Sequence, residues 1–141
     1  MPARRSGDAL ERDGERLFAR AHCDACHVPT LRTGGFAAVA ELSEQDIHAY
    51  TDLLLHDLGE GLADVRPTFA AQGREWRTAP LWGIGLVRTV NEHTRFLHDG
   101  RARDVSEAIL FHDGEARNAR AAYVGMSVSE RRALLAFLDS L

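Results

Sequence analysis

The chain has 141 residues, a formal net charge of −4 and a composition that is 45% hydrophobic and 27% charged. This length fits one domain, so we expect residues 1–7 to form a loose tail and residues 8–141 a single domain. No apolar run approaches the roughly 20 residues that a membrane span needs. The acidic balance argues against a nucleic-acid partner, because phosphate binding requires a basic face.

Two helices are predicted in the first part of the chain. Residues 8–21 carry an apolar stripe that includes Phe18 and Gly14, and Asp8 suits the N-cap. Residues 44–56 predict a second helix, with Ser43 as its cap. Its expected apolar face consists of Ile47, Tyr50, Leu54 and Leu58.

Two more helices are predicted near the end. One runs over residues 104–112, where Asp104 and Glu107 form a pair that resembles a capping box. The last begins near Ser127, with Glu130 three residues on and Phe137 on its apolar stripe. Residues 28–40 are predicted to be loop, and residues 59–101 a long irregular excursion with a short helical turn or small hairpin. With no long β-branched alternation in the chain, the predicted fold class is all-α.

The two cysteines of the chain lie in one Cys-x-x-Cys-His motif, Cys23 to His27. Thiols three residues apart can reach the two vinyl groups of one porphyrin edge, and the next imidazole then lies beneath the iron. The motif therefore predicts one covalent haem c, attached at Cys23 and Cys26, with His27 as the proximal iron ligand. A zinc site would need further ligands, and a thioredoxin-like redox pair would need a βαβ context that is not visible.

A glycine on the first helix supports a cytochrome c-like haem domain in which the excursion wraps the haem. Gly14 lies four residues before Phe18, and Phe137 lies on the buried stripe of the last helix. In mono-haem cytochromes c the first and last helices cross at a small residue against an aromatic one. Glycine costs a helix roughly 1 kcal/mol relative to alanine, which a close helix crossing would explain.

His112 is the favoured distal ligand. It shares one helix face with Val105, Ala108 and Ile109, and a haem could cover that face. Met126 is the alternative, because it precedes the last helix, where many small cytochromes c place an axial methionine. His98 is a third candidate, next to an Asp-Gly turn signal.

Several blocks in a fixed order carry a family resemblance. They are the haem motif, residues 56–59 (His-Asp-Leu-Gly), residues 73–85, residues 96–102 (Phe-Leu-His-Asp-Gly-Arg-Ala) and residues 107–112. Together they resemble the C-terminal haem domain of the di-haem cytochrome c peroxidase superfamily. Within it they are most similar to the di-haem oxidoreductases described as putative peroxidases or thiol oxidoreductases.

The resemblance has implications for the site. It implies an electron-transferring haem whose distal ligand, Met or Tyr in relatives, falls at His112 here. The peroxidases have a second haem domain, yet the sequence holds one Cys-x-x-Cys-His. They also bind calcium partly through a Thr-x-Pro; the sequence reads His93-Thr94-Arg95 at that place, so calcium is not expected. The thiol oxidoreductase label finds no support, because both thiols would be thioethers.

The functional hypothesis is a c-type cytochrome domain that transfers single electrons through a haem held by His27 and His112. We expect Trp76, Trp82 and Phe96 to pack around the porphyrin. The alternative is a peroxidase or oxidoreductase whose distal ligand dissociates to open the iron, although an electron-transfer domain is favoured over an independent enzyme. The expected partner is a redox protein or a second haem domain.

The expected location is the periplasm or another exported site, because c-type haem is attached outside the cytoplasm. Residues 1–7 lack the apolar stretch of a signal peptide. We interpret the chain as a mature fragment, an excised domain or an incomplete product.

Overall fold

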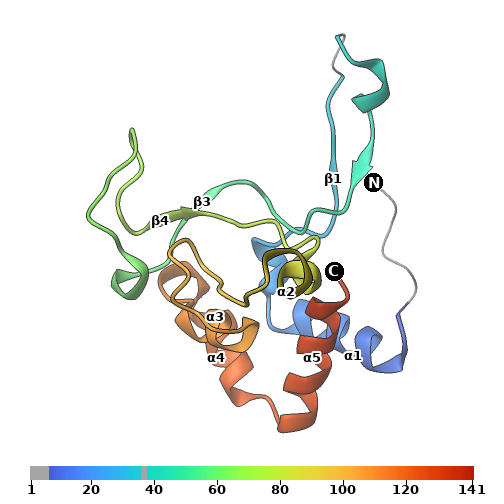
Figure 1. The fold of residues 1–141 in the computed structure, drawn as a ribbon, viewed down its shortest axis with the longest axis vertical. Helices are drawn as coiled ribbons and strands as arrows, with labels where there is room; N and C mark the ends of the chain where they lie inside the picture. The colour runs from blue at the N-terminus through green and yellow to red at the C-terminus, as the bar shows by residue number, and fades with distance from the viewer. Residues whose placement is uncertain (1–6, 36–37) are drawn as a thin grey trace.

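The fold was analysed in a computed structural model that describes residues 7–35 and 38–141. The described residues form five α-helices: α1 (Ala9–Arg20), α2 (Val87–Asn91), α3 (Val105–Phe111), α4 (Arg117–Gly125) and α5 (Val128–Asp139). Short 3-10 helices include η1 (Cys23–Ala25), η4 (Ile84–Leu86) and η5 (Gly114–Ala116). In Figure 1, α1 and α5 lie side by side, with α3 and α4 beside them.

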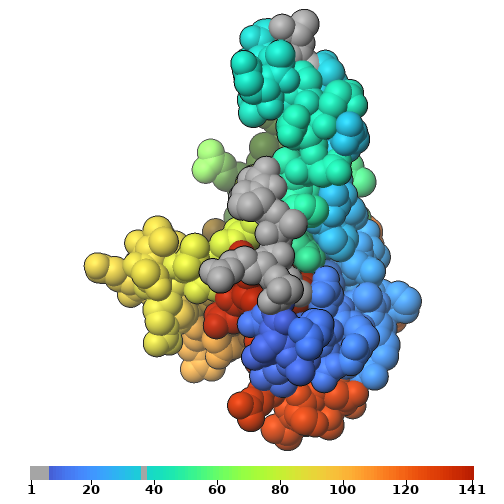
Figure 2. Space-filling view, turned by 90° about the vertical axis from the view of Figure 1, so that its right-hand side faces the viewer, coloured from blue at the N-terminus to red at the C-terminus, as the bar shows by residue number. Residues whose placement is uncertain are grey.

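Two small antiparallel sheets lie outside the helical part, so the all-α prediction is wrong. Strand β1 (Leu31–Arg32) pairs with β2 (Asp46–Ile47), and β3 (Leu55–Asp57) pairs with β4 (Glu75–Arg77). The β1–β2 pair forms an arm that projects away from the helices, as Figures 1 and 2 show. The protein is therefore a mixed fold with a helical part and extended segments around it.

The helix predicted over residues 44–56 does not form. Glu44, Tyr50 and Leu53 have φ angles of 57°, 53° and 61°, in the left-handed region that a right-handed helix excludes. The side chains of Thr51 and Asp52 bond to nearby backbone N–H groups at Leu53 and Leu54. Such local hydrogen bonds compete with a helix, and here they produce an extended segment that leads into β3.

The predicted boundaries of the other three helices are close to the observed ones. Asp8 caps α1 by accepting a hydrogen bond from the Glu11 N–H, and Asp104 caps α3 in the same way. Ser127 and Glu130 form a reciprocal capping box at the start of α5. Caps of this kind satisfy N–H groups that have no partner within the helix, so the polar residues in the sequence mark the helix starts.

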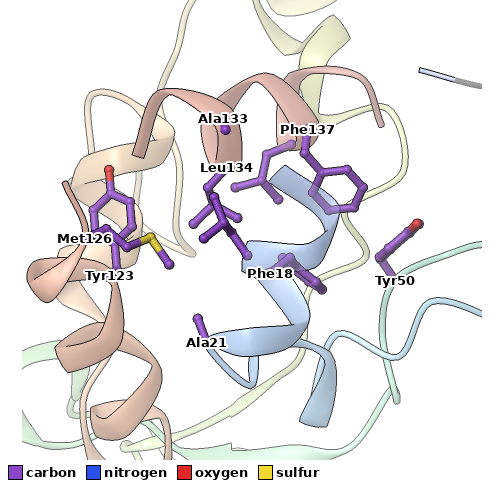
Figure 3. Close-up of a cluster of buried hydrophobic side chains, with 10 residues drawn as sticks. Phe18, Ala21, Tyr50, Tyr123, Met126, Ala133, Leu134 and Phe137 are labelled. Carbon is purple, nitrogen blue, oxygen red and sulfur yellow. The ribbon is translucent and has the colours of Figure 1, made fainter. Parts of the chain in front are cut away.

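The core lies where α1 and α5 cross (Figure 3). A Cβ atom at Gly14 would overlap the Ala133 carbonyl and lie 2.6 Å from the Phe137 Cβ, so the predicted close crossing at glycine is present. Phe18 packs against the Phe137 and Tyr50 rings, with ring centroids 5.4 and 6.0 Å apart. The exposed ends of the two helices are also joined by an ion pair between Arg20 and Glu130.

None of the helices in the described ranges has both the length and the apolar character that a membrane crossing requires.

Candidate haem site

A cavity lies between the helices and contains three of the predicted haem-binding residues. Cys23, His27 and His112 all line it. Its empty space is about 590 Å³, a figure that includes the part open to solvent. Most of the wall is apolar: Phe18 of α1, Leu81, Ile84 of η4, Val105, Ala108 and Ile109 of α3, Ala119 of α4, and Leu134 and Leu138 of α5.

The haem motif follows α1 through a sharp turn. Helix α1 ends at Arg20, and His22 takes a left-handed conformation with φ at 59°. This turn leads into η1, and the N–H of His27 donates to the carbonyl of Cys23 at 3.0 Å. The turn therefore brings Cys23 and His27 to the same cavity.

The His27 imidazole is fixed by a backbone carbonyl. Its Nδ1 lies 3.0 Å from the carbonyl oxygen of Tyr50, and a carbonyl can only accept, so Nδ1 carries the proton. Burial lowers the pKa of His27 to about 4, although the hydrogen bond to Tyr50 opposes this shift. The neutral ring with its proton on Nδ1 has an unprotonated Nε2, which is the form that binds a metal ion.

His112 has the same arrangement on another element. It is the C-cap residue of α3, and its Nδ1 donates to the Ala108 carbonyl oxygen at 2.8 Å. Burial lowers the pKa of His112 too. The nearby His112 ring also contributes to the lowering of the His27 pKa. Two neutral imidazoles with unprotonated Nε2 atoms therefore line one cavity from two separate elements.

Neither cysteine has the properties of a redox-active thiol. Burial and the nearby Asp24 raise the pKa of Cys23 to about 11, and burial, Asp52 and Glu115 raise the pKa of Cys26. The two thiols are not joined by a disulfide. Reactive cysteines need a lowered pKa, so the environment does not favour thiol–disulfide exchange.

Cys26 lies beside a second polar cluster rather than in the cavity wall. Its sulfur lies within 4.8 Å of ligand-type atoms of Asp52 and His56. Both His56 nitrogens are already 2.8 Å from carboxylate oxygens, one of Asp52 and one of Glu115. The cluster is therefore a hydrogen-bonded network beside the haem motif.

The remaining predicted site residues do not line the cavity. Trp76 donates its indole N–H to the Leu62 carbonyl and stacks on His98, with ring centroids 3.5 Å apart. Trp82 is 41% exposed, and Phe96 pairs with Ala102 in an isolated β-bridge. Met126 is buried in the core cluster beside Tyr123 (Figure 3).

Sequence reasoning missed several residues that shape the site. Arg120 of α4 lines the cavity and lies 3.5 Å from Asp113, its ion-pair partner. Helix α4 was not predicted, because Ala116 at its N-cap provides no side-chain hydrogen bond. Tyr50 acts through its backbone carbonyl, which no side-chain pattern can reveal. The Asp52–His56–Glu115 network joins residues far apart in the sequence.

Three observations indicate that a haem fits this site. The cavity wall is mostly apolar, two imidazoles that carry their proton on Nδ1 line it, and a cysteine of the motif lies in its wall. Haem iron in proteins is held by axial ligands of this kind.

Comparison with known proteins adds one match. The family model described as "Di-haem oxidoreductase, putative peroxidase" matches residues 1–141. No curated protein and no solved structure shows significant similarity to the chain.

Proposed function

The chain belongs to the di-haem oxidoreductase family, and from this premise we propose that it is a c-type cytochrome domain that transfers single electrons. Membership of the family implies a haem-binding, redox-active protein. The proposal adds that one haem is attached covalently to Cys23 and Cys26, with His27 and His112 as its axial ligands. The haem would supply an iron that carries one electron.

The observation that carries the proposal is that His27 and His112 have the same hydrogen-bonding arrangement and line the same cavity. Each donates its Nδ1–H to a backbone carbonyl, and each lines the same apolar cavity. The backbone bonds fix the tautomer and the ring orientation, as partners of metal-bound histidines usually do. Met126 and His98 are weaker candidates for the second iron ligand, because neither lines the cavity.

Ligation by two histidines favours electron transfer over peroxide chemistry. Two strong ligands leave no open position on the iron, and rigid rings limit the structural change that accompanies gain or loss of an electron. The alternative, a peroxidase, would require His112 to move out of the cavity.

The partner would be a redox protein or a second haem domain. The family is named for two haems, whereas the sequence contains one Cys-x-x-Cys-His motif. A second haem would then come from another polypeptide region or another protein. Covalent attachment of haem also requires maturation outside the cytoplasm, so we propose an exported location.

The test is to express the chain with the c-type haem maturation machinery and record its absorption spectra in both redox states. We expect covalent haem that is lost when Cys23 and Cys26 are replaced by alanine. The wild type should be six-coordinate and low-spin, and His112→Ala should become high-spin. Met126→Leu and His98→Ala are the matched controls and should keep the wild-type spectrum.

Two outcomes would contradict the proposal. Absence of covalent haem would show that the chain is not a c-type cytochrome. A wild-type spectrum in His112→Ala would show that His112 is not an iron ligand. A high-spin wild type that reacts with peroxide would favour the peroxidase instead.

A further inference from the structure

A histidine lies between two carboxylates beside the haem motif. His56 of β3 places Nε2 at 2.8 Å from Asp52 and Nδ1 at 2.8 Å from Glu115. A carboxylate can only accept, so both bonds exist together only when both ring nitrogens carry protons. The side chains of His56 and Asp52 are only 17% and 12% exposed, which shields this contact from water.

The electrostatic surroundings favour the doubly protonated ring. The hydrogen bond to Glu115 and then that to Asp52 raise the pKa of His56, against the effect of burial. The hydrogen bond with His56 lowers the pKa of Glu115 in turn. The other neighbours supply little free charge: the Cys26 thiol has a raised pKa, Asp57 pairs with Arg74, and the residue opposite His56 on β4 is Trp76.

The network is attached to the segment that follows His112. Glu115 lies three residues after His112, within η5. Its second carboxylate oxygen accepts from the Asp57 N–H at 3.0 Å. Gly114 packs so closely that a Cβ there would overlap the Asp57 carbonyl, at a φ of 55°. Strand β3 and η5 are therefore held together by side-chain bonds on one side and by backbone contact on the other.

The same segment also reaches His27. The carbonyl of Tyr50 accepts from His27 Nδ1, and His56 is only six residues further along. Residues 50–57 thus contact His27 directly and, through Glu115, the η5 segment that follows His112.

We propose that His56 is a positioning residue, whose imidazolium bridges Asp52 and Glu115 and thereby holds His112 within reach of the haem iron. This inference rests on the proposed function, in which His112 is the distal ligand. When His56 loses a proton, the neutral ring has one N–H and can donate to one carboxylate only. The other nitrogen then presents a lone pair to a negative oxygen, which loosens η5 and the ligand before it.

The direction with pH follows from linkage. The folded-state pKa of His56 is raised above its ordinary value of 6.5. Its contribution is therefore fully present below about pH 6.5 and is lost as pH rises through the raised value. Distal ligation should weaken on the alkaline side.

The first test is a pH titration of the absorption spectrum of the haem-loaded chain. Wild type should develop a high-spin fraction as pH rises. His56→Gln should show a high-spin fraction already at neutral pH, with no titration, because glutamine donates from one nitrogen only. Glu115→Gln removes one charge and should move the midpoint downward by about one pH unit or more. His48→Gln is the matched control: His48 bonds to Thr30 outside the network, and the variant should behave as wild type.

A second measurement also uses the haem-loaded chain. Nitrogen-15 NMR of the histidine rings should show both His56 nitrogens protonated at pH 6.5. Circular dichroism of each variant checks that it folds. A His56 that titrates at or below 6.5 would overturn the proposal, as would a wild-type titration curve in His56→Gln while His112→Ala is high-spin. If His112→Ala keeps the wild-type spectrum, His112 is not the ligand. The positioning role of His56 is then also excluded, whatever the NMR shows.

Discussion

Two parts of the molecule border the candidate haem site, and they are stabilised by different means. The α1–α5 pair is held by apolar side chains that are almost completely buried, among them Phe18, Leu134 and Phe137. Residues 50–57 are held by hydrogen bonds from short polar side chains to backbone groups. The stability of the helical pair should therefore depend on side-chain volume. The stability of the extended segment should depend on single polar atoms.

Removal of Phe137 should have the largest effect. Phe137→Ala would remove a fully buried ring that packs on Phe18 and Tyr50. We expect the free energy of unfolding to fall by about 3–5 kcal/mol, measured by denaturant unfolding of the haem-free chain. Val128→Ala on the same helix is the control, because Val128 is 87% exposed, and should change stability by less than about 0.5 kcal/mol. Equal losses would contradict the view that packing holds this pair.

Addition of one methyl group at the crossing should have the next largest effect. Gly14→Ala improves helix propensity by roughly 1 kcal/mol but places a Cβ against the Ala133 carbonyl. We expect a net loss of about 1–3 kcal/mol. Gly125→Ala is the matched control, because nothing lies within 4 Å of a Cβ built there. A gain of stability in Gly14→Ala would show that the helices can separate without cost.

In the extended segment, loss of the Thr51 hydroxyl should reduce stability even when the side-chain shape is kept. Thr51 is completely buried, donates to the Thr78 carbonyl at 2.7 Å and accepts from the Leu53 N–H. Thr51→Val keeps the shape and leaves both groups unpaired, so we expect a loss of about 1–3 kcal/mol. The same substitution at exposed Thr68 should change stability by less than about 0.5 kcal/mol. If Thr51→Val unfolded like wild type, the hydrogen bonds would not be what holds this segment.

The smallest effect is expected at the tip of the loop between β3 and β4. Phe69 is fully exposed and has a φ of 52°, a conformation that asparagine adopts more readily. Phe69→Asn should leave the free energy of unfolding within about 0.5 kcal/mol of wild type. A clear loss in thermal or denaturant unfolding would show that this loop packs against the rest of the molecule.

The helical part of the fold could be predicted because its signals are local. Asp8, Asp104 and Ser127 act within one helical turn, and the Gly14 crossing shows in the sequence as a glycine on an apolar stripe. Helix α4 has no such signal, since its cap is an alanine and its buried face includes small residues. It was missed for that reason.

The extended part could not be predicted, because its contacts are made by backbone atoms or by distant partners. Ile47, Tyr50 and Leu54 have helical spacing, yet one lies in a strand, one in the core and one is 60% exposed. Left-handed conformations at Tyr50 and Leu53 cannot be inferred from those residue types. In the site, the motif and the face of His112 were predicted, whereas the Tyr50 carbonyl and Glu115 were not.

The crossing at Gly14 also bears on the order in which the chain matures. Its two helices come from opposite ends of the chain, so the main core is a non-local contact that cannot close until α5 has been made. Contacts of this kind form slowly, because the intervening chain must first be brought together. For the covalent attachment proposed above, Cys23 and Cys26, which follow α1 in the chain, would remain accessible to an attachment enzyme throughout that interval. The fold would thus leave time for this modification before α5 packs on α1.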